Sequence, residues 1–152
     1  MQLPHDWNEF ISSLRSHRVR FLIVGAHAMA QHGVVRFSQD LDVFVEPTPA
    51  NARRLGRALA DFGYRALAAA ADQFAITFER AWRGRKTVTL GGRRVGVIGL
   101  RELVANKRAT GRQKDQLDVA QMEAEGVLRP ASRARRRRTR AGRRSRRGSR
   151  RR

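Results

Sequence analysis

The pattern of apolar and polar residues predicts a helix, a strand and a second helix in the first part of the chain. Apolar residues at helical spacing over residues 6–17 indicate an amphipathic helix, with Asp6 in the position of an N-cap. Residues 19–24 form a short apolar run rich in Val and Ile, which favours a strand. Gly25 ends this run, and residues 26–31 are predicted to form a helix. The predicted order is therefore strand, tight turn, helix.

A second strand is predicted over residues 41–45, where acidic and apolar residues alternate. Successive side chains of a strand point to opposite faces, so Asp40 and Asp42 are expected on one face and Leu41, Val43 and Val45 on the other. The two carboxylates are therefore predicted to point in the same direction.

The rest of the pattern completes a single α/β domain over residues 1–128. The predicted segments are a helix over residues 49–62, a strand over 74–78, a hairpin with strands over 87–90 and 93–98, and helices over 100–109 and 114–125. The hairpin is predicted because Gly91 and Gly92 can adopt the positive backbone angles that a tight turn between two strands requires. The preceding helix, over residues 49–62, is expected to cover the sheet.

The composition excludes several classes of site and compartment. The chain of 152 residues has no cysteine, so neither a disulfide framework nor a thiolate zinc site is expected. No run of residues approaches the roughly 18 apolar residues of a membrane span, and the first residues lack the pattern of a signal peptide. These features predict a soluble, unprocessed cytoplasmic protein without a membrane partner.

The net charge of +20 is concentrated at the end of the chain. Residues 129–152 contain 14 arginines and no acidic residue, so residues 1–128 carry +20 minus 14, or +6. This segment consists mainly of Arg, Ala, Ser and Gly without apolar periodicity, which predicts a disordered tail. Two interpretations remain open: a polycationic arm that binds nucleic acid, or a stretch read out of frame or past a lost stop codon.

Residues 21–45 contain a strand, a glycine turn, a helix, a loop and an acid-bearing strand, in that order. Here the sequence resembles the nucleotidyltransferase superfamily with a DNA-polymerase-β-like palm, and within it small bacterial proteins related to AbiEii-type toxins. Family members carry Gly-Gly or Gly-Ser in the turn, where this chain has Gly25 and Ala26, so the alanine is a departure. An Arg-x-Thr-x-Asp-x-Asp stretch then follows, matched here by Arg36, Ser38, Asp40 and Asp42. The resemblance covers most of residues 18–123 and implies a palm-like mixed sheet flanked by helices.

The resemblance implies a nucleotide and metal site around the two acidic residues. Asp40 and Asp42 would hold Mg²⁺, since hard oxygen ligands suit an ion that bridges triphosphate oxygens. The turn at Gly25 and Ala26 and the side chain of Ser38 would bind the nucleotide, with backbone amides at the helix start facing phosphate. An Asp-x-Asp pair alone is also typical of a solvated strand end.

A later motif spans residues 103–118 and resembles the second signature of the family. By this resemblance, Lys107 would contact the nucleotide phosphates, while Asp115 and Asp118 would orient Lys107 or brace the helix pair. The same pattern is typical of solvated helices, in which Arg112, Lys114 and Asp118 form structural salt bridges.

Family members carry a third carboxylate on a central strand, and this chain has no obvious equivalent. The interval where it is expected is short, and Asp72 is the only carboxylate within it, with Glu79 the next after it. Asp72 is therefore the candidate third catalytic acid, although it follows an alanine run instead of lying in an apolar strand.

The leading hypothesis is a Mg²⁺-dependent nucleotidyltransferase that moves a nucleoside monophosphate from NTP to a hydroxyl acceptor. The resemblance suggests tRNA or a protein as the acceptor, in a toxin–antitoxin setting with a cognate antitoxin as partner. The alternatives are a catalytically inactive palm domain that serves as a binding or regulatory module, and a protein that binds nucleic acid through its basic tail.

Overall fold

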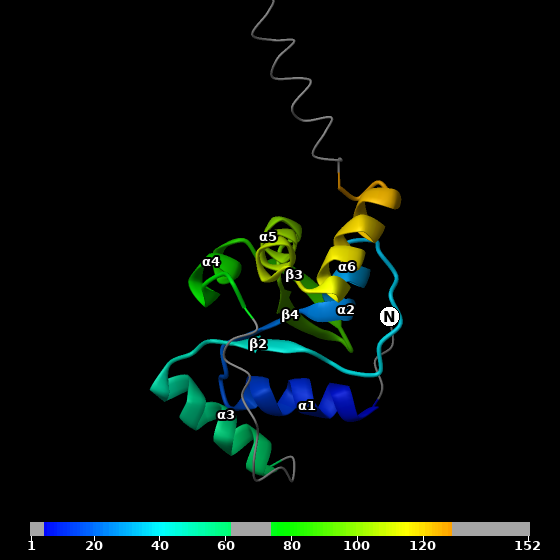
Figure 1. Ribbon diagram of the computed structural model, residues 1–152. Helices are drawn as coiled ribbons and strands as arrows, with labels where there is room; N and C mark the ends of the chain where they lie inside the picture. Colours follow the sequence, from blue (N-terminus) through cyan, green and yellow to red (C-terminus); the bar gives the residue numbers. More distant parts are fainter. Residues whose placement is uncertain (1–4, 62–73, 129–152) are drawn as a thin grey trace, which may run out of the picture.

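The computed structural model describes residues 5–61 and 74–128 of the chain. These residues form a mixed α+β structure around a four-stranded sheet with the strand order β2-β1-β4-β3 (Figure 1). The strands are β1 (Phe21–Ile23), β2 (Val43–Val45), β3 (Lys86–Leu90) and β4 (Arg93–Val97). β1 pairs antiparallel with β2 and parallel with β4, and β4 pairs antiparallel with β3. The mixed sheet flanked by helices, predicted above, is thus confirmed.

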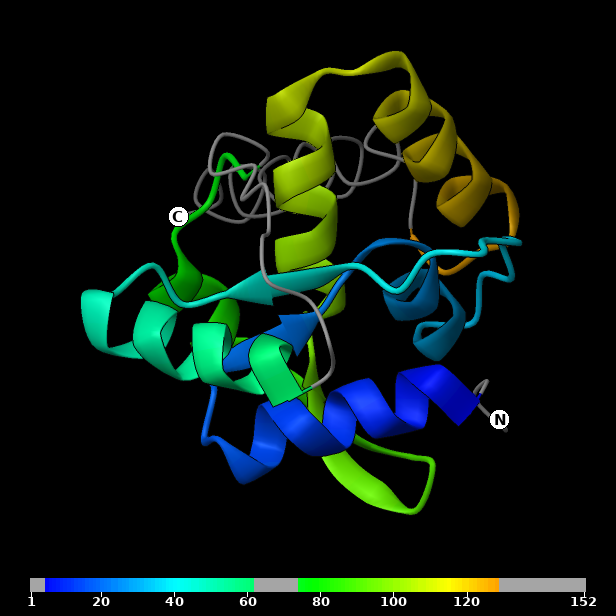
Figure 2. The ribbon, with the colours of Figure 1, turned by 90° about the horizontal axis from the view of Figure 1, so that it is seen from below.

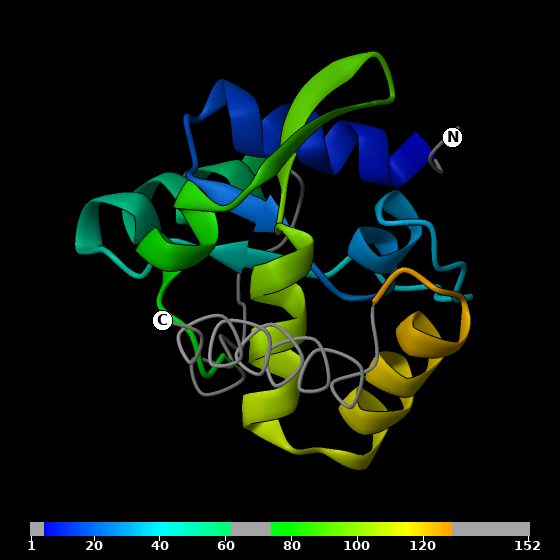
Figure 3. The same cartoon turned by 90° about the horizontal axis from the view of Figure 1, so that it is seen from above.

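Helices lie on both sides of the sheet. They are α1 (His5–Ser16), α2 (Gly25–Gln31), α3 (Pro49–Asp61), α4 (Phe78–Arg83), α5 (Leu100–Thr110) and α6 (Gln113–Ala124). Figure 1 shows α1 and α3 on one side of the sheet and α4, α5 and α6 on the other. α1 and α3 pack against each other in the view from below (Figure 2), as α5 and α6 do in the view from above (Figure 3). No helix within residues 5–61 and 74–128 is long and apolar enough to cross a membrane.

The hydrophobic core is built around β1, whose three residues are all buried. Ile11 and Leu14 of α1 and Val97 of β4 are almost fully buried in the same cluster as Leu22 and Ile23. Because β1 is covered on both faces, its sequence is a continuous apolar run and not an alternating one. The core therefore fixes the end of β1, and with it the turn at Gly25.

Most elements predicted from the sequence are present, with boundaries that differ by at most two residues. The hairpin of β3 and β4 turns at Gly91 and Gly92, which have φ angles of 54° and 75°. The prediction of a strand over residues 74–78 is wrong. The Thr77 side chain accepts a hydrogen bond from the backbone N–H of Arg80, and Thr77 caps helix α4. A local N-cap outweighs the two-residue alternation of apolar side chains here.

β2 begins at Val43, so Asp40 and Asp42 precede the strand and do not lie within it. The ladder with β1 is short because β1 ends at the turn to α2. The proposed third acid, Asp72, and the proposed disordered tail, residues 129–152, lie outside the described residues.

Candidate functional site

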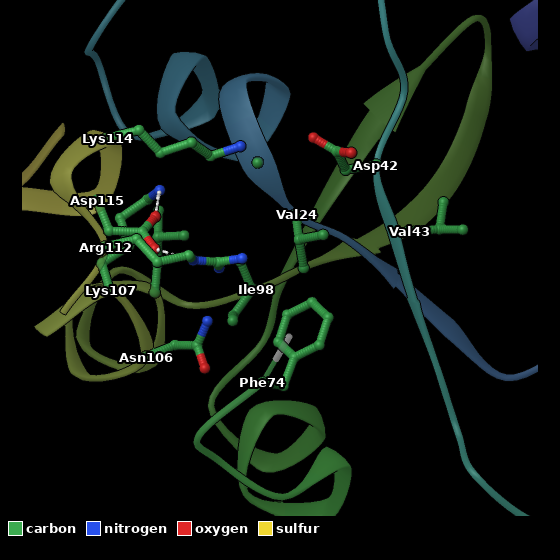
Figure 4. Close-up of a pocket in the computed structure, with 12 residues that line it drawn as sticks. Val24, Asp42, Val43, Phe74, Ile98, Asn106, Lys107, Arg112, Lys114 and Asp115 are labelled. Carbon is green, nitrogen blue, oxygen red and sulfur yellow. Dashed lines mark hydrogen bonds and ion pairs between the residues drawn. The ribbon is translucent and has the colours of Figure 1, made fainter. Parts of the chain in front are cut away.

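A pocket of about 110 Å³ lies where β1 turns into α2, between this turn and the α5–α6 pair (Figure 4). It is lined by Val24, Gly25, Asp42, Val43, Phe74, Ile98, Leu103, Asn106, Lys107, Arg112, Lys114 and Asp115. Four residues predicted from the sequence to form the site, Gly25, Asp42, Lys107 and Asp115, therefore meet in one pocket. They come from segments that are far apart in the chain.

Asp42 is placed at the pocket by the end of the β1–β2 ladder. The backbone N–H of Val24 donates to the carbonyl of Asp42 over 3.0 Å, which extends the pairing by one residue beyond β2. The side chain of Asp42 is exposed and lies directly against Gly25. Its carboxylate has no hydrogen bond or ion pair with another residue of the described part of the chain. Asp42 is therefore an accessible oxygen ligand at the pocket.

Gly25 is required by the close approach of this carboxylate. Gly25 has a φ angle of +62°, and a Cβ atom built on it would lie 2.1 Å from Oδ2 of Asp42. Both the backbone angle and the contact exclude a side chain. The glycine predicted from the turn pattern therefore lets Asp42 lie over the start of α2.

We expect Gly25→Ala to destabilise the protein by about 2 kcal/mol or more, because it combines strain at a positive φ angle with a clash against Asp42. The matched control is Gly56→Ala in α3, where an added Cβ would meet no atom within 4 Å. This control should stabilise the protein by about 0.5 to 1 kcal/mol, since alanine is the better helix former. Urea unfolding of both variants measures the contrast, and equal effects would contradict the packing described for Gly25.

The remaining predicted residues of the nucleotide site lie outside the lining of this pocket as the described residues define it. Asp40 is exposed in the loop before β2. Its backbone N–H donates to the hydroxyl of Ser38 over 3.2 Å, so Ser38 supports the loop conformation. Ala26 is buried in the core behind the turn. The structure thus separates Asp42, which faces the pocket, from Asp40, which precedes it by two residues.

The other carboxylates of the described residues do not complete a metal site with Asp42. Glu79 lies in the first turn of α4 and pairs with Arg20 over 3.3 Å, outside the pocket. Within residues 5–61 and 74–128, no group of three or more His, Cys, Asp or Glu side chains is arranged to hold a metal ion. A metal ion would therefore receive at most two ligands from such side chains of the described residues, and its remaining ligands would come from water or substrate.

Lys107 lines the pocket, but its charge is neutralised beneath the surface. Its side chain is 6% exposed, and its Nζ donates to Oδ1 of Asp115 over 2.9 Å and to Oδ2 of Asp118 over 2.5 Å. Arg36 also donates to Asp118, over 3.0 Å, and connects the loop after α2 to α6. This buried cluster holds α5, α6 and the loop together.

Asp115 is the most strongly bonded carboxylate of the cluster. Thr110 and Arg112 each donate to its Oδ2 over 2.8 Å, in addition to the bond from Lys107 to Oδ1. Burial raises the pKa of Asp115, but these hydrogen bonds and the charge of Lys107 outweigh burial and lower the pKa from 3.8 to about 2. Asp115 is therefore ionised at neutral pH.

The lowered pKa of Asp115 predicts a loss of stability in acid. A carboxylate with a depressed pKa in the folded state contributes stability above its unfolded pKa, and this contribution is lost as the pH falls from about 4 to about 2. We expect a loss of about 2 kcal/mol from this group across that interval. Urea unfolding between pH 5 and pH 2 measures it. Asp115→Asn should have a flatter profile, and an equally steep profile in this variant would assign the acid sensitivity to other groups.

Two cations complete the pocket on the side opposite Asp42. Arg112 is the N-cap residue of α6 and Lys114 lies in the first turn of this helix. Figure 4 shows the ammonium group of Lys114 extended across the pocket toward Asp42. Lys114 is exposed and has no hydrogen bond or ion pair with another described residue. The salt bridge that the sequence pattern favoured for Lys114 does not form within the described residues. The position of Lys114 beside Asp115 in the sequence pointed to this pocket. Only the fold shows that Lys107 is buried and Lys114 is accessible.

Phe74 and Asn106 also line the pocket and were not predicted as site residues. Phe74 stacks on Phe44 with ring centroids 3.8 Å apart, and Asn106 accepts a hydrogen bond from the backbone N–H of Ala75 over 2.7 Å. The first contact holds the segment before α4 against β2 and the second holds it against α5, so these residues shape one wall of the pocket.

Comparisons of the chain with protein-family models, with curated proteins and with solved structures return no match.

Proposed function

We propose that the chain is a Mg²⁺-dependent nucleotidyltransferase that transfers a nucleoside monophosphate from NTP to a hydroxyl acceptor, either RNA such as tRNA or a protein. The observation that carries the proposal is the pocket itself, where the accessible carboxylate of Asp42 faces the ammonium group of Lys114. A metal ligand on one side and a cation on the other suit a triphosphate that carries a divalent ion.

The residues present fit a magnesium ion that is bound largely by its substrate. Mg²⁺ is commonly held by one or two carboxylates, with water and substrate phosphates as its other ligands. Asp42 supplies an accessible carboxylate at the pocket, and Asp40, two residues earlier in the loop, is the second proposed ligand. When bound, the metal would neutralise charge on the triphosphate and orient it.

In the proposed reaction, the acceptor oxygen forms a bond to the α-phosphorus and the bond to the leaving pyrophosphate breaks. The proton of the acceptor hydroxyl passes to water. Lys114 would bind the phosphates of the leaving group, where negative charge develops, and Arg112, whose Nε donates to Asp115, would add its positive charge beside them. Asp42 and Lys114 would thereby hold the reacting phosphate in line with the acceptor.

This proposal gives Lys107 a structural role in place of the phosphate contact implied by the family resemblance. Two of the three N–H bonds of its ammonium group point to Asp115 and Asp118. The negative charges of these carboxylates oppose the binding of a phosphate to the same ammonium group. Lys107 and Asp115 therefore support the turn that presents Lys114 and Arg112.

The transfer reaction is tested with purified protein, an α-labelled NTP and Mg²⁺, with total RNA or the protein itself as acceptor. We expect covalent label on one of the two acceptors, dependent on Mg²⁺ and lost with EDTA. Each of the four NTPs is tried separately. The absence of transfer under all these conditions would contradict the enzyme proposal.

A second candidate is an inactive member of the same fold that binds NTP without turnover. The small number of accessible carboxylates favours this candidate. Of the two carboxylates that line the pocket within the described residues, Asp115 is bonded by Lys107, Thr110 and Arg112, and only Asp42 is accessible. Binding of a fluorescent NTP that depends on Lys114, together with the absence of label transfer, would support this candidate.

A further inference from the structure

A second surface feature lies between α1 and the β3–β4 hairpin. An open groove there is lined by Ser12, Arg15, Ser16, Gly92, Arg93 and Arg94. It therefore combines three guanidinium groups and two hydroxyl groups, and no carboxylate is among the lining residues. The hairpin runs beside α1 in the views from below and above (Figures 2 and 3).

Two of the three arginines of this groove are bonded to backbone carbonyls, and all three keep their charge. Arg15 donates from Nη1 to the carbonyl of Arg94, and Arg93 donates from Nη1 to the carbonyl of Gly91 over 3.2 Å. Within the described residues, none of the three guanidinium groups pairs with a carboxylate, whereas Arg20 and Arg36 do. A guanidinium has five N–H donors, so a bond to one carbonyl leaves most of them available.

This bonding suits recognition of phosphate. A guanidinium that is already ordered loses less side-chain entropy when it binds an anion, and its planar fork can donate two parallel hydrogen bonds to phosphate oxygens. The hydroxyl of Ser12 adds a neutral donor and acceptor beside the arginines, and the hydroxyl of Ser16, which donates to the carbonyl of Ser13 over 2.9 Å, adds an acceptor. Such hydroxyls can bond the 2′-OH of a ribose.

The groove is separate from the Asp42 pocket. Arg93 and Arg94 begin β4, while Ile98, which follows the last residue of β4, lines the pocket. Five strand residues span about 16 Å, so the two features lie at opposite ends of this strand. A ligand of the groove must therefore either be distinct from the nucleotide in the pocket or be long enough to extend between them.

We propose that this groove binds the phosphodiester backbone of an RNA strand, with Arg15, Arg93 and Arg94 on successive phosphates and the serines beside the riboses. Three cationic side chains along one groove match a polyanion with repeating phosphates better than a single phosphate group. The proposal does not depend on the transferase activity, because binding at the groove needs neither NTP nor metal.

The test is fluorescence anisotropy with a labelled 12-nucleotide single-stranded RNA of mixed sequence and with DNA of the same sequence, using the full chain. The triple variant Arg15→Gln, Arg93→Gln and Arg94→Gln is compared with the control variant Arg53→Gln, Arg57→Gln and Arg83→Gln. The control residues are exposed and have no side-chain hydrogen bond or ion pair within the described part of the chain. Both variants lose the same charge and keep residues 129–152, so the basic tail contributes equally to both.

We expect the groove variant to bind RNA about 10-fold more weakly, with a salt slope that is lower by about 2, because each lost contact to a single strand removes about 0.7 of slope. The control variant should keep most of its affinity and slope. Equal losses in both variants, no loss in the groove variant, or equal affinity for DNA and RNA would overturn the proposal. Arg15 also connects α1 to β4, so its replacement could lower stability. The double variant Arg93→Gln and Arg94→Gln, which keeps Arg15, is therefore measured both for RNA binding and for thermal unfolding. It should lose RNA affinity at unchanged Tm.

Discussion

Asp42→Asn is expected to reduce Mg²⁺-dependent transfer by about 100-fold or more and to leave the fold intact. The amide is a poorer ligand for Mg²⁺ than the carboxylate it replaces, and the loss of a ligand should exceed the 10- to 100-fold effects known for residues that support ligands. Asp42 has no hydrogen bond or ion pair with another described residue, so its replacement removes no stabilising contact. Removal of one of two nearby acidic charges should slightly stabilise the metal-free protein. Initial rates with α-labelled NTP and thermal unfolding measure the two effects.

Two further variants make this result specific. Asp61→Asn is the matched control, because Asp61 is 66% exposed on α3, pairs only with His17 in the described residues, and is not part of the pocket. It should leave transfer unchanged. Asp40→Asn tests the second proposed ligand and should lose transfer as deeply as Asp42→Asn. Unchanged turnover in both Asp42→Asn and Asp40→Asn would end the metal-site proposal.

Lys114 distinguishes phosphate binding from metal binding in the same assay. Lys114→Gln should raise the KM for NTP by about 10-fold, corresponding to the loss of one charge-assisted hydrogen bond of about 1.4 kcal/mol. Because Asp42→Asn affects the metal, part of its defect should be recovered at high Mg²⁺ concentration. The defect of Lys114→Gln should not be recovered in this way, since the residue contacts phosphate directly in the proposal.

Local sequence rules predicted the parts of the site that depend on backbone geometry. Gly25 follows an apolar run and precedes a helix, and that order predicted the turn over which Asp42 lies. Gly91 and Gly92 predicted the hairpin for the same reason, because few other residues adopt positive φ angles readily. These features are encoded within a few residues and need no knowledge of the rest of the fold.

The parts that failed depend on contacts between distant segments. Lys107 and Lys114 are both cations on adjacent helices, and only the packing of α5 against α6 buries the first and exposes the second. The strand predicted over residues 74–78 is the exception, because a local contact, the N-cap formed by Thr77, starts helix α4 there. The positions of Asp40 and Asp42 relative to the sheet depended on where β1 ends, which is set by the fold.

The buried cluster leads to the largest expected effect on stability. Lys107→Met should lower the free energy of unfolding by about 3 to 5 kcal/mol at neutral pH, because it leaves Asp115 and Asp118 buried without their shared cation. Methionine keeps most of the volume of the side chain, so the loss reports the charge and not a cavity. The exposed lysine provides the control: Lys114→Met should change stability by no more than about 0.5 kcal/mol. Urea unfolding at pH 7 measures both variants.

The pH dependence identifies the cause of this loss. In the wild type, the pKa of Asp115 is lowered to about 2, so its contribution is present at neutral pH and lost as the pH falls from about 4 to about 2. Burial raises the pKa of Asp115, and the hydrogen bond and charge of Lys107 help to lower it. Without Lys107, the pKa of Asp115 should therefore rise. Its protonation in the folded variant then removes the buried charge, so the difference in stability between wild type and Lys107→Met should narrow as the pH falls toward 3. Adding Asp118→Asn to Lys107→Met should recover part of the loss at pH 7 for the same reason. A difference that stays constant with pH would show that Lys107 stabilises the protein through packing and not through its charge.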